Sequence, residues 1–548
     1  MHPAKIVRAC AICFGLLLFA GGCAPKRYDD EARGVTAGLD LDCMIGQMIM
    51  AAVPGRKMNR TVDSLLTRYR LGGVILFGHN ISDSNGLAQF IARMQECAID
   101  SYGVPLFVSI DQEGGRVIRI TEGVTQFPGA MAAGVGGDPD LAYQWGRVLG
   151  LELRRLGVNM NLAPVLDVNN NPSNPVINTR SFGSDPSLVG RMGASYIRGL
   201  QASRCIAVGK HFPGHGDTDL DSHHILPVIR YTMDRLKRVE LAPFRDAVKA
   251  RVDGIMTAHI AYPAILDGME PATLSRAFLS GVLRDELGFT GLIITDDLEM
   301  KAISGRIEMG EAAVRAVSAG ADIILVSSYE KSIPAIFTAL RHAVEEGRIP
   351  RSRIEESVRR IIEVKIRYGI MAPVRGKKSL PAFACSQEEL EILNGADALN
   401  RELSRKGMLL FGDAGRALPD APIRRYVFTQ SKLLQSELSK AAVTVPCDNI
   451  VLCLDRATRG PKGVLYVHVV EPQVGFVRWA ASACRERGVE CVLVSTGNPF
   501  PLTMAGSMES GILTFSNTDE SIRQLALCLS GSFRPRTGGL RLRLEEKR

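Results

Sequence analysis

The chain has few aromatic residues and no long apolar stretch beyond its first 25 positions. Only 6% of its 548 residues are aromatic, whereas proteins that bind single-stranded nucleic acid need aromatic rings on which bases stack. A run of about 20 apolar residues is needed to cross a bilayer, and none follows the N-terminal leader. We therefore expect no nucleic-acid partner and no membrane-spanning helix in the body of the chain.

Two common cofactor patterns are also missing. No Cys-x-x-Cys spacing of the zinc-site kind lies outside the leader, and no Gly-x-Gly-x-x-Gly follows a predicted strand. Among the 12 cysteines, Cys484 and Cys491 are candidates for a disulfide if the protein is exported. A chain of this length needs no disulfide scaffold, so we expect mostly buried free thiols.

Positive charge is concentrated at the end of the chain. The net charge is +8, and residues 534–548 hold six basic residues against Glu545 and Glu546. We interpret this segment as a solvated basic tail. The alternative is a segment that adheres to an acidic polymer or a membrane surface.

The N-terminus has the pattern of a secretory leader. Lys5 and Arg8 precede the apolar run Ala9–Ala20, which is followed by Gly21-Gly22-Cys23. Small residues directly before a cysteine resemble a bacterial lipoprotein signal. We predict that residues 1–22 are removed and that Cys23 is acylated, so that the protein is exported and lipid-anchored on the periplasmic or extracellular face. An ordinary cleaved signal or an uncleaved anchor is the alternative, and the apolar run is short for a membrane span.

Residues 40–370 alternate short β-rich runs with helical stretches. Eight such runs suit a (β/α)8 TIM-like barrel, and a doubly wound open sheet is the rival fold. The predicted strands lie near residues 47–53, 73–77, 105–110, 160–168, 206–210, 254–260, 292–295 and 321–327.

Polar or ionisable residues follow nearly every predicted strand of this region. In barrels, the carboxyl ends of the strands surround the active site, so side chains at these positions converge on one cleft. A single such carboxylate is more often a helix cap, but several from separate strands indicate a catalytic site. The residues are Asp111, Asp167, Lys210, His211, His259 and Asp296.

A second, smaller α/β sandwich domain is predicted after the barrel. Residues 371–404 combine a Pro- and Gly-containing linker with a helix near 387–405, and residues 405–533 form the C-terminal domain. Its predicted strands are 407–411, 449–454, 464–470, 490–495 and 511–515, and its predicted helices are 476–486 and 521–529. Residues 412–443 have no clear pattern.

One segment, Lys210 to His224, holds four of the nine histidines together with three aspartates. Its glycines and proline predict a loop, and loops at the mouth of a barrel carry function. The residue types alone fit a metal site, a catalytic acid/base or a loop that satisfies its own backbone.

The amino-acid sequence of this loop resembles that of family 3 of the glycoside hydrolases, in its β-N-acetylglucosaminidase branch. Lys-His-Phe-Pro-Gly-His-Gly-Asp-Thr followed by Asp221-Ser222-His223 is similar to the family signature. Segments beginning at Asp111, Asn174 and Thr295 resemble its sugar-binding loops and nucleophile segment. The resemblance covers residues 40 to 530 and implies no metal and no organic cofactor.

By this resemblance Asp296 is the nucleophile that forms a glycosyl-enzyme, and His223, paired with Asp221, is the general acid and then the base. Asp297 is the competing carboxylate, but successive strand side chains point to opposite faces, so we expect only one to face the cleft. His215 and His224 are expected to hold the loop, and Asp167 and His259 to shape the cleft floor. The resemblance assigns sugar binding to Asp111, Arg119, Arg180, Lys210 and His211.

The predicted function is that of a retaining exo-β-N-acetylglucosaminidase. Its substrate would be an oligosaccharide with terminal N-acetylglucosamine, from peptidoglycan fragments or chitin. The alternatives are a β-glucosidase or phosphorylase of the same family, and a wall-sugar-binding lipoprotein without activity. The oligomeric state is not predicted.

Overall fold

The computed structural model describes residues 24–371, apart from 267, and residues 385–537, apart from 413–417, 419–424, 441–443, 460–463, 471–473 and 499–509. The predicted signal peptide 1–22 and the acylation site Cys23 lie outside the described residues. So do most of the linker, 372–384, and most of the basic tail, 538–548.

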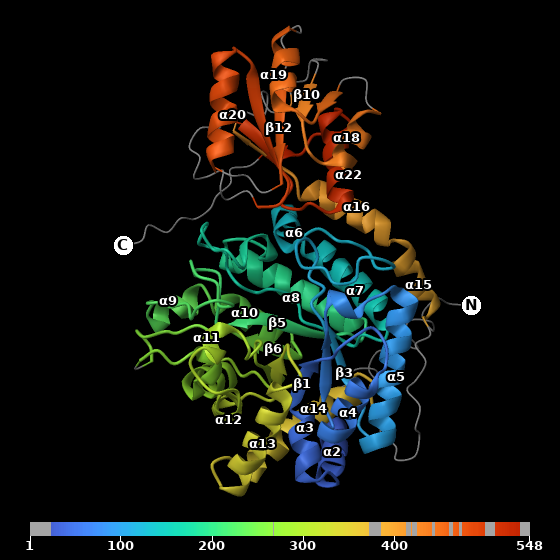
Figure 1. Ribbon diagram of the computed structural model, residues 1–548, viewed down its shortest axis with the longest axis vertical. Coiled ribbons are helices and arrows are strands. Elements are labelled where there is room, and N and C mark those ends of the chain that lie inside the picture. The colour runs from blue at the N-terminus through green and yellow to red at the C-terminus, as the bar shows by residue number, and fades with distance from the viewer. Residues whose placement is uncertain are drawn as a thin grey trace, which may run out of the picture.

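The first domain is an eight-stranded parallel barrel, which confirms the predicted fold class (Figure 1). Neighbouring strands pair in the order β7-β6-β5-β4-β3-β2-β1-β8, and a parallel bridge between Ile294 and Ile323 joins the two ends. Every strand residue is buried, as expected for strands enclosed by helices. The strands are β1 (Ile49–Ala52), β2 (Gly73–Leu76), β3 (Phe107–Ile110), β4 (Met160–Asn161), β5 (Ile206–Phe212), β6 (Gly254–Thr257), β7 (Leu292–Ile294) and β8 (Ile324–Val326).

Helices surround the strands and bury their apolar stripes against them. Several begin at an Asp or Asn whose side chain accepts from the first turn, such as Asn59, Asp83, Asp138 and Asp185. The surrounding helices are α3 (Leu41–Gln47), α4 (Arg60–Tyr69), α5 (Ser84–Tyr102), α6 (Ala130–Gly136), α7 (Pro139–Arg155), α8 (Pro186–Ala202), α9 (Met233–Arg238), α10 (Ala242–Lys249), a π-helix η6 (Ala277–Glu286), α11 (Lys301–Ser304), α12 (Met309–Ala319) and α13 (Ser332–Glu345), with short 3₁₀ turns η3 (Gly78–Asn80), η4 (Asn178–Arg180) and η5 (Ala272–Leu274).

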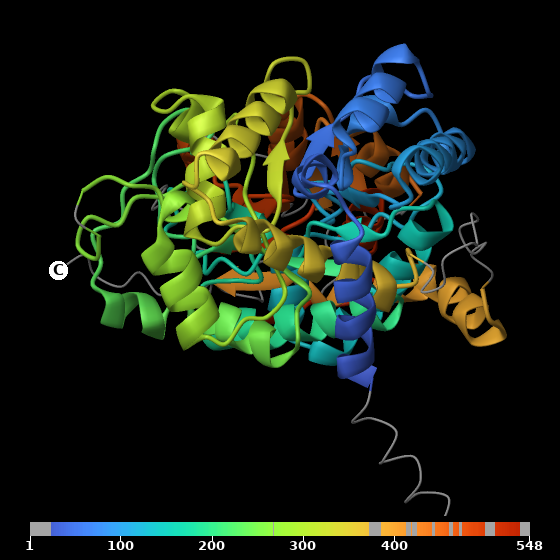
Figure 2. The ribbon, with the colours of Figure 1, turned by 90° about the horizontal axis from the view of Figure 1, so that it is seen from below.

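Helix α14 (Arg351–Arg367) closes the end of the barrel at which the strands begin. Its side chains bond residues that precede strands: Arg360 contacts Asp322 before β8, Arg367 contacts Asp253 before β6, and Lys365 donates to the Gly72 carbonyl before β2. Helix α2 (Ala24–Ala37) packs against α14 and adds an ion pair between Asp29 and Arg359. Figure 2 shows both helices at this end of the molecule.

The second domain is a seven-stranded sheet with helices on both faces. Its strand order is β11-β10-β12-β13-β14-β9-β15, and within it only the β14–β9 pair is antiparallel. Helices α18 and α22 cover one face, and α19 and α20 cover the other. The elements are β9 (Leu409–Gly412), β10 (Arg425–Phe428), α18 (Lys432–Leu438), β11 (Thr444–Cys447), α19 (Ile450–Arg459), β12 (Val464–Val469), α20 (Val474–Glu486), β13 (Glu490–Ser495), β14 (Ser510–Leu513), α22 (Asp519–Leu529) and β15 (Arg536–Thr537).

Three details of this domain differ from the prediction. The expected strand 449–454 is the start of helix α19, because Asn449 accepts hydrogen bonds from the backbone of Val451 and Leu452 and caps the helix. Strand β10 lies inside the region 412–443 that had no clear pattern, and β11 begins directly after that region. Cys447 and Cys453 form a disulfide that the sequence analysis did not name, whereas Cys484 and Cys491 are free thiols, which was the favoured expectation for the cysteines.

Two helices connect the domains where one was expected. Gly395 separates α15 (Gln387–Asn394) from α16 (Ala396–Lys406). The second domain docks on α6 through an apolar cluster that joins Met131 and Ala132 to Leu409, Leu513 and Phe515. Within the described part of the chain, no helix is both long and apolar enough to cross a membrane.

Candidate active site

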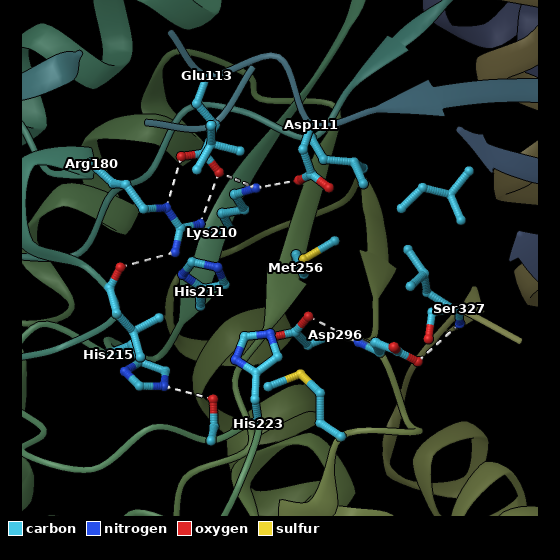
Figure 3. Close-up of a pocket in the computed structure, with 18 of the residues that line it drawn as sticks. Asp111, Glu113, Arg180, Lys210, His211, His215, His223, Met256, Asp296 and Ser327 are labelled. Atoms are coloured by element: carbon cyan, nitrogen blue, oxygen red, sulfur yellow. Dashed lines mark hydrogen bonds and ion pairs between the residues drawn. The ribbon is translucent and has the colours of Figure 1, made fainter. Parts of the chain in front are cut away.

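A pocket of about 420 Å³ opens where the barrel strands end, on the opposite side of the barrel from α14. It is lined by residues in the last part of the strands β2, β5, β6 and β8 and by residues of the loops that follow β2, β3, β4, β5, β7 and β8. All five predicted sugar-binding residues line it, and so do the predicted nucleophile and the predicted acid (Figure 3). These residues are Asp111, Arg119, Arg180, Lys210, His211, His223 and Asp296.

A cluster of buried charges forms one wall of the pocket. Lys210 Nζ lies 2.6 Å from Asp111 Oδ1 and 2.6 Å from Glu113 Oε1. Arg180 makes a two-pronged contact with the same glutamate, Nε to Oε2 and Nη2 to Oε1, each at 2.8 Å. Burial would raise the pKa of Glu113, but Arg180 and Lys210 hold it well below its usual range. The cluster therefore keeps rigid charges available for hydrogen bonds to a polar ligand.

Glu113 is a site residue to which the sequence analysis gave no role, although it lies in the segment that begins at Asp111. It lies two residues after Asp111, and its side chain joins Arg180 to Lys210. Its position after a strand end was the available signal. Without Glu113, the buried cations of Arg180 and Lys210 would lose the carboxylate that lies between them.

Arg119 lies at the rim of the pocket. Its Nη2 is 4.0 Å from Asp111 Oδ2, and its guanidinium carbon is 6.0 Å from the centre of the Phe77 ring. Its Nε is buried and has no hydrogen-bond partner within the described residues. The arginine is thus only partly satisfied by the protein.

Asp296 lies at the base of the pocket, two residues beyond the end of β7. Its Oδ1 accepts the backbone N–H of Asp297 at 2.9 Å. Burial by itself would raise the pKa of Asp296, but His211, His259 and Lys210 together hold it below its ordinary value. A buried carboxylate is therefore kept ionised in a site with nearby positive charge.

The expectation that only one of the two adjacent aspartates faces the cleft is wrong. Both Asp296 and Asp297 line the pocket. Strand β7 ends at Ile294, so the alternation of side chains along a strand no longer applies at these positions. The two differ in their contacts: Asp297 Oδ1 accepts the backbone N–H groups of Glu299 and Ser327, and so ties β7 to β8.

Asp167 is fully buried and organises the start of the histidine loop. Its carboxylate contacts His211 Nδ1 at 2.7 Å and accepts the backbone N–H groups of His211 at 3.2 Å and His215 at 2.7 Å. Burial would raise the pKa of Asp167, but His211 keeps it lowered. Asp167 therefore orients the His211 ring rather than merely shaping the cleft floor.

His259 has a supporting place beside Asp296. Its Nδ1 is 2.8 Å from Thr273 Oγ1, and its Nε2 is 2.9 Å from the Asp297 carbonyl. Burial lowers the pKa of His259, and the ring supports the nucleophile segment through its contact with the Asp297 carbonyl.

His215 holds the loop from within. Its Nε2 lies 2.9 Å from Ser222 Oγ, and its Nδ1 lies 2.9 Å from Thr218 Oγ1. Burial lowers the pKa of His215 to about 4, so the ring is neutral at physiological pH. Asn174 closes the same region by donating to the His215 carbonyl at 2.8 Å.

Asp221 and His223 form a close pair on the outer part of the loop. Asp221 Oδ1 is 2.7 Å from His223 Nδ1 and accepts the His223 backbone N–H at 2.9 Å. The side chains are 31% and 60% exposed, respectively, in contrast to the buried charge cluster. His223 lines the pocket with Asp296, while His224 is 75% exposed and 3.9 Å from Asp221.

The loop histidines are spread over separate partners. Within the described residues, no group of three or more His, Cys, Asp or Glu side chains forms a metal-binding arrangement. His211 bonds Asp167, His215 bonds Ser222 and Thr218, and His223 bonds Asp221.

Buried carboxylates and a histidine that meet at the mouth of a parallel barrel suit nucleophilic and acid/base chemistry such as glycoside hydrolysis. The domain family described as "Glycosyl hydrolase family 3 N terminal domain" matches residues 40–364. The chain belongs to this family and is a glycoside hydrolase.

Named relatives agree with this assignment. The chain is 33% identical over 417 residues to "Beta-hexosaminidase A" of Pseudoalteromonas piscicida, covering 71% of this chain and 69% of that protein. It is 34% identical to "Beta-hexosaminidase LpqI" of Mycobacterium tuberculosis, covering 61% of this chain and 85% of that protein.

Solved structures extend the similarity over both domains. A family 3 β-N-acetylglucosaminidase from Paenibacillus sp. str. FPU-7 superposes with a TM-score of 0.79 at 37% identity, covering 91% of this chain and 98% of that chain. A structure titled "Beta-glucoside phosphorylase BglX bound to 2FGlc" has a TM-score of 0.78 at 21% identity, covering 94% of this chain and 96% of that chain, and supports the fold alone.

Proposed function

We propose that the protein is a retaining exo-β-N-acetylglucosaminidase that removes terminal, non-reducing N-acetylglucosamine. The observation that carries this proposal is that Asp296 and His223, which are far apart in the chain, line one pocket. The names of the relatives and the solved N-acetylglucosaminidase support the choice of sugar.

Asp296 is the proposed nucleophile. Its ionised carboxylate attacks the anomeric carbon and forms a covalent glycosyl-enzyme while the leaving group departs. The lowered pKa of Asp296 and its position between His211, His259 and Lys210 support this role, because a nucleophile must be ionised before the sugar binds. Asp297 is a weaker candidate, since its carboxylate accepts two backbone N–H groups and burial raises its pKa.

His223 is the proposed general acid and, in the second half of the reaction, the base. With Nδ1 bonded to Asp221, the Nε2 nitrogen is the one that can donate a proton to the glycosidic oxygen. The Asp221 carboxylate would stabilise the protonated imidazole. In deglycosylation His223 would take a proton from the attacking water.

The charge cluster is the proposed sugar-binding wall. Asp111 accepts hydrogen bonds from hydroxyls, and Arg119, Lys210 and His211 donate to them. Arg180 is held by Glu113 and Lys210 is shared between two carboxylates, so little rearrangement is needed when a sugar binds.

One assay separates the family activities. The full chain is incubated with a chromogenic β-N-acetylglucosaminide and with the matching glucoside, with and without phosphate. We expect release from the first substrate, little from the second and no requirement for phosphate. Asp296→Asn should lower kcat by at least about 10³-fold, because the covalent step is lost. Release from the glucoside alone, or release that needs phosphate, would replace the proposal with one of its alternatives.

The natural substrates that we propose are peptidoglycan fragments or chitooligosaccharides, which both carry terminal N-acetylglucosamine. We further propose that Cys23 is acylated and holds the enzyme on the outer side of a bacterial membrane. The support for the anchor is the charged start, the short apolar run and Ala20-Gly21-Gly22 before the cysteine.

A further inference from the structure

Among the contacts that hold the catalytic loop, one lies within the loop beside the pocket and another connects the loop to a segment outside the pocket. The inner tie is His215, which spans Thr218 and Ser222. The outer tie is Asp217, whose Oδ2 accepts the Tyr231 hydroxyl at 2.5 Å. Tyr231 lies after the loop and just before α9, outside the motif that carries the chemistry.

Tyr231 is itself held by a chain of charged contacts. The guanidinium carbon of Arg235 lies 4.7 Å from the centre of the Tyr231 ring. Arg235 Nη1 donates to both carboxylate oxygens of Glu240 at 2.9 Å. The Glu240 side chain is only 1% exposed and that of Arg235 only 15%, so this pair lies largely out of solvent.

The chain of contacts returns to the beginning of the loop. A Cβ atom on Gly214 would lie 2.7 Å from Glu240 Cβ, so the glutamate packs directly on the loop backbone. Tyr262 donates to the Gly214 carbonyl at 3.0 Å from the other side. These contacts form a closed circuit that holds the part of the loop after Asp217, which we call the outer arm. We call the circuit itself the outer latch, and it consists of Gly214, Asp217, Tyr231, Arg235 and Glu240.

The Tyr231 hydroxyl is protonated and can therefore donate a hydrogen bond to Asp217. Burial and the Asp217 carboxylate raise the pKa of Tyr231 well above its ordinary value, so the phenol keeps its proton and donates. The acid/base pair beyond Asp217 is exposed by comparison, and Leu220 and Ile225 beside it are 42% and 54% exposed. A segment with so little burial needs a fixed point nearby to hold one position.

We propose that Tyr231 is a positioning residue for the Asp221–His223 pair, because it fixes Asp217 and thereby the arm of the loop that carries the acid. The inference rests on the proposed role of His223. Loss of the Tyr231 hydroxyl frees the outer arm, and His223 then meets the glycosidic oxygen less often. Sugar binding and Asp296 are not touched by this change.

Dependence on the leaving group tests the proposal. Tyr231→Phe is assayed on N-acetylglucosaminides whose leaving groups range from dinitrophenol, which departs without a proton, to phenol and a second sugar, which need one. We expect kcat/KM to fall about 10- to 100-fold for the poor leaving groups and to stay within about threefold for dinitrophenol. An equal loss on all substrates, or no loss, overturns the proposal.

Three further variants keep the result interpretable. Asp217→Asn retains an acceptor oxygen for the tyrosine and should resemble the wild type. Asp217→Ala removes the acceptor and should show the same leaving-group dependence as Tyr231→Phe. This pair of variants tests the positioning role even if the Tyr231 variant folds poorly. Tyr102→Phe removes a tyrosine hydrogen bond of 2.8 Å to the Leu71 carbonyl far from the loop and should leave the leaving-group dependence unchanged.

His223→Ala separates failure of the latch from failure of the proposed acid. If this variant loses activity only on poor leaving groups while Tyr231→Phe does not, the latch is wrong and the acid stands. If His223→Ala shows no leaving-group dependence, the acid assignment itself is wrong, and the latch falls with it.

Discussion

Asp167 shows how much one buried carboxylate can organise. It accepts three N–H groups, from the ring and backbone of His211 and from the backbone of His215. An asparagine at this position has one acceptor oxygen and an amide NH₂ that would face donors. The geometry of the sugar-binding wall and of the catalytic loop thus depends on a residue that is not among those lining the pocket.

We expect Asp167→Asn to lower kcat/KM about 10²-fold, because the His211 ring and the loop shift from their positions. The measurement is steady-state kinetics on the chromogenic glucosaminide, with near-ultraviolet circular dichroism to verify the fold. The control is Asp140→Asn, an exposed aspartate on α7, which should behave as wild type. Wild-type kinetics for Asp167→Asn would contradict the organising role.

Helix α14, which closes the end of the barrel at which the strands begin (the barrel floor), carries a buried lysine, Lys365. Lys365 Nζ donates to Gln47 Oε1 at 2.7 Å and to the Gly72 carbonyl at 2.9 Å, and lies 4.8 Å from the centre of the Phe107 ring. Neither of these two hydrogen-bond partners carries a negative charge. Burial lowers the pKa of Lys365 to about 7.

This lysine should make folding stability depend on pH in a predictable direction. Its unfolded pKa is about 10.4, so between about pH 7 and 10 the unfolded chain binds more protons than the folded one. The contribution of Lys365 to the free energy of unfolding therefore rises with pH across this window, by about 1.4 kcal/mol per unit. Below pH 7 the unfavourable contribution is complete, and above about 10.4 it vanishes.

Denaturant unfolding of the wild type and of Lys365→Met across this range measures the effect. The difference in unfolding free energy between the two should change with pH by the amount above. Lys301→Met, at an exposed position on α11, serves as the control and should give a flat difference. A flat difference for Lys365→Met would show that the lysine stays charged in the folded protein.

At the scale of the whole molecule, the barrel floor and the pocket lie on opposite sides. Helix α2 begins at Ala24, directly after Cys23, and packs on α14 below the barrel. Figure 1 shows α2 at the other end of the molecule from the second domain. Helix α2 therefore lies on the side of the barrel opposite to the pocket.

The proposed anchor has a direct test. Cells that express the full chain are fed an alkyne fatty acid, and the purified protein is examined for the label. We expect labelling of the wild type and its loss in Cys23→Ser, with release of the enzyme from membranes. Cys97→Ser, a partly buried cysteine on α5, is the matched control. An unlabelled wild type would rule out the anchor without affecting the proposed hydrolysis.

The sequence alone determined the barrel, because eight β-rich runs at helix-sized intervals are a local pattern and the parallel sheet follows from it. It also singled out the histidine loop and, through the family resemblance, the residues that line the pocket. It wrongly predicted a strand for the short apolar run after Asn449, which is helical, since such a run suits either element.

Only the tertiary structure decided which charges meet. The partnership of Glu113 with Arg180 spans 67 positions and that of Lys210 with Asp111 spans 99, and no local spacing encodes either. The same holds for the outer latch and for the two aspartates that both reach the pocket. Contacts between distant segments depend on how strand ends are brought together around the barrel, and that arrangement exists only once the sheet has closed.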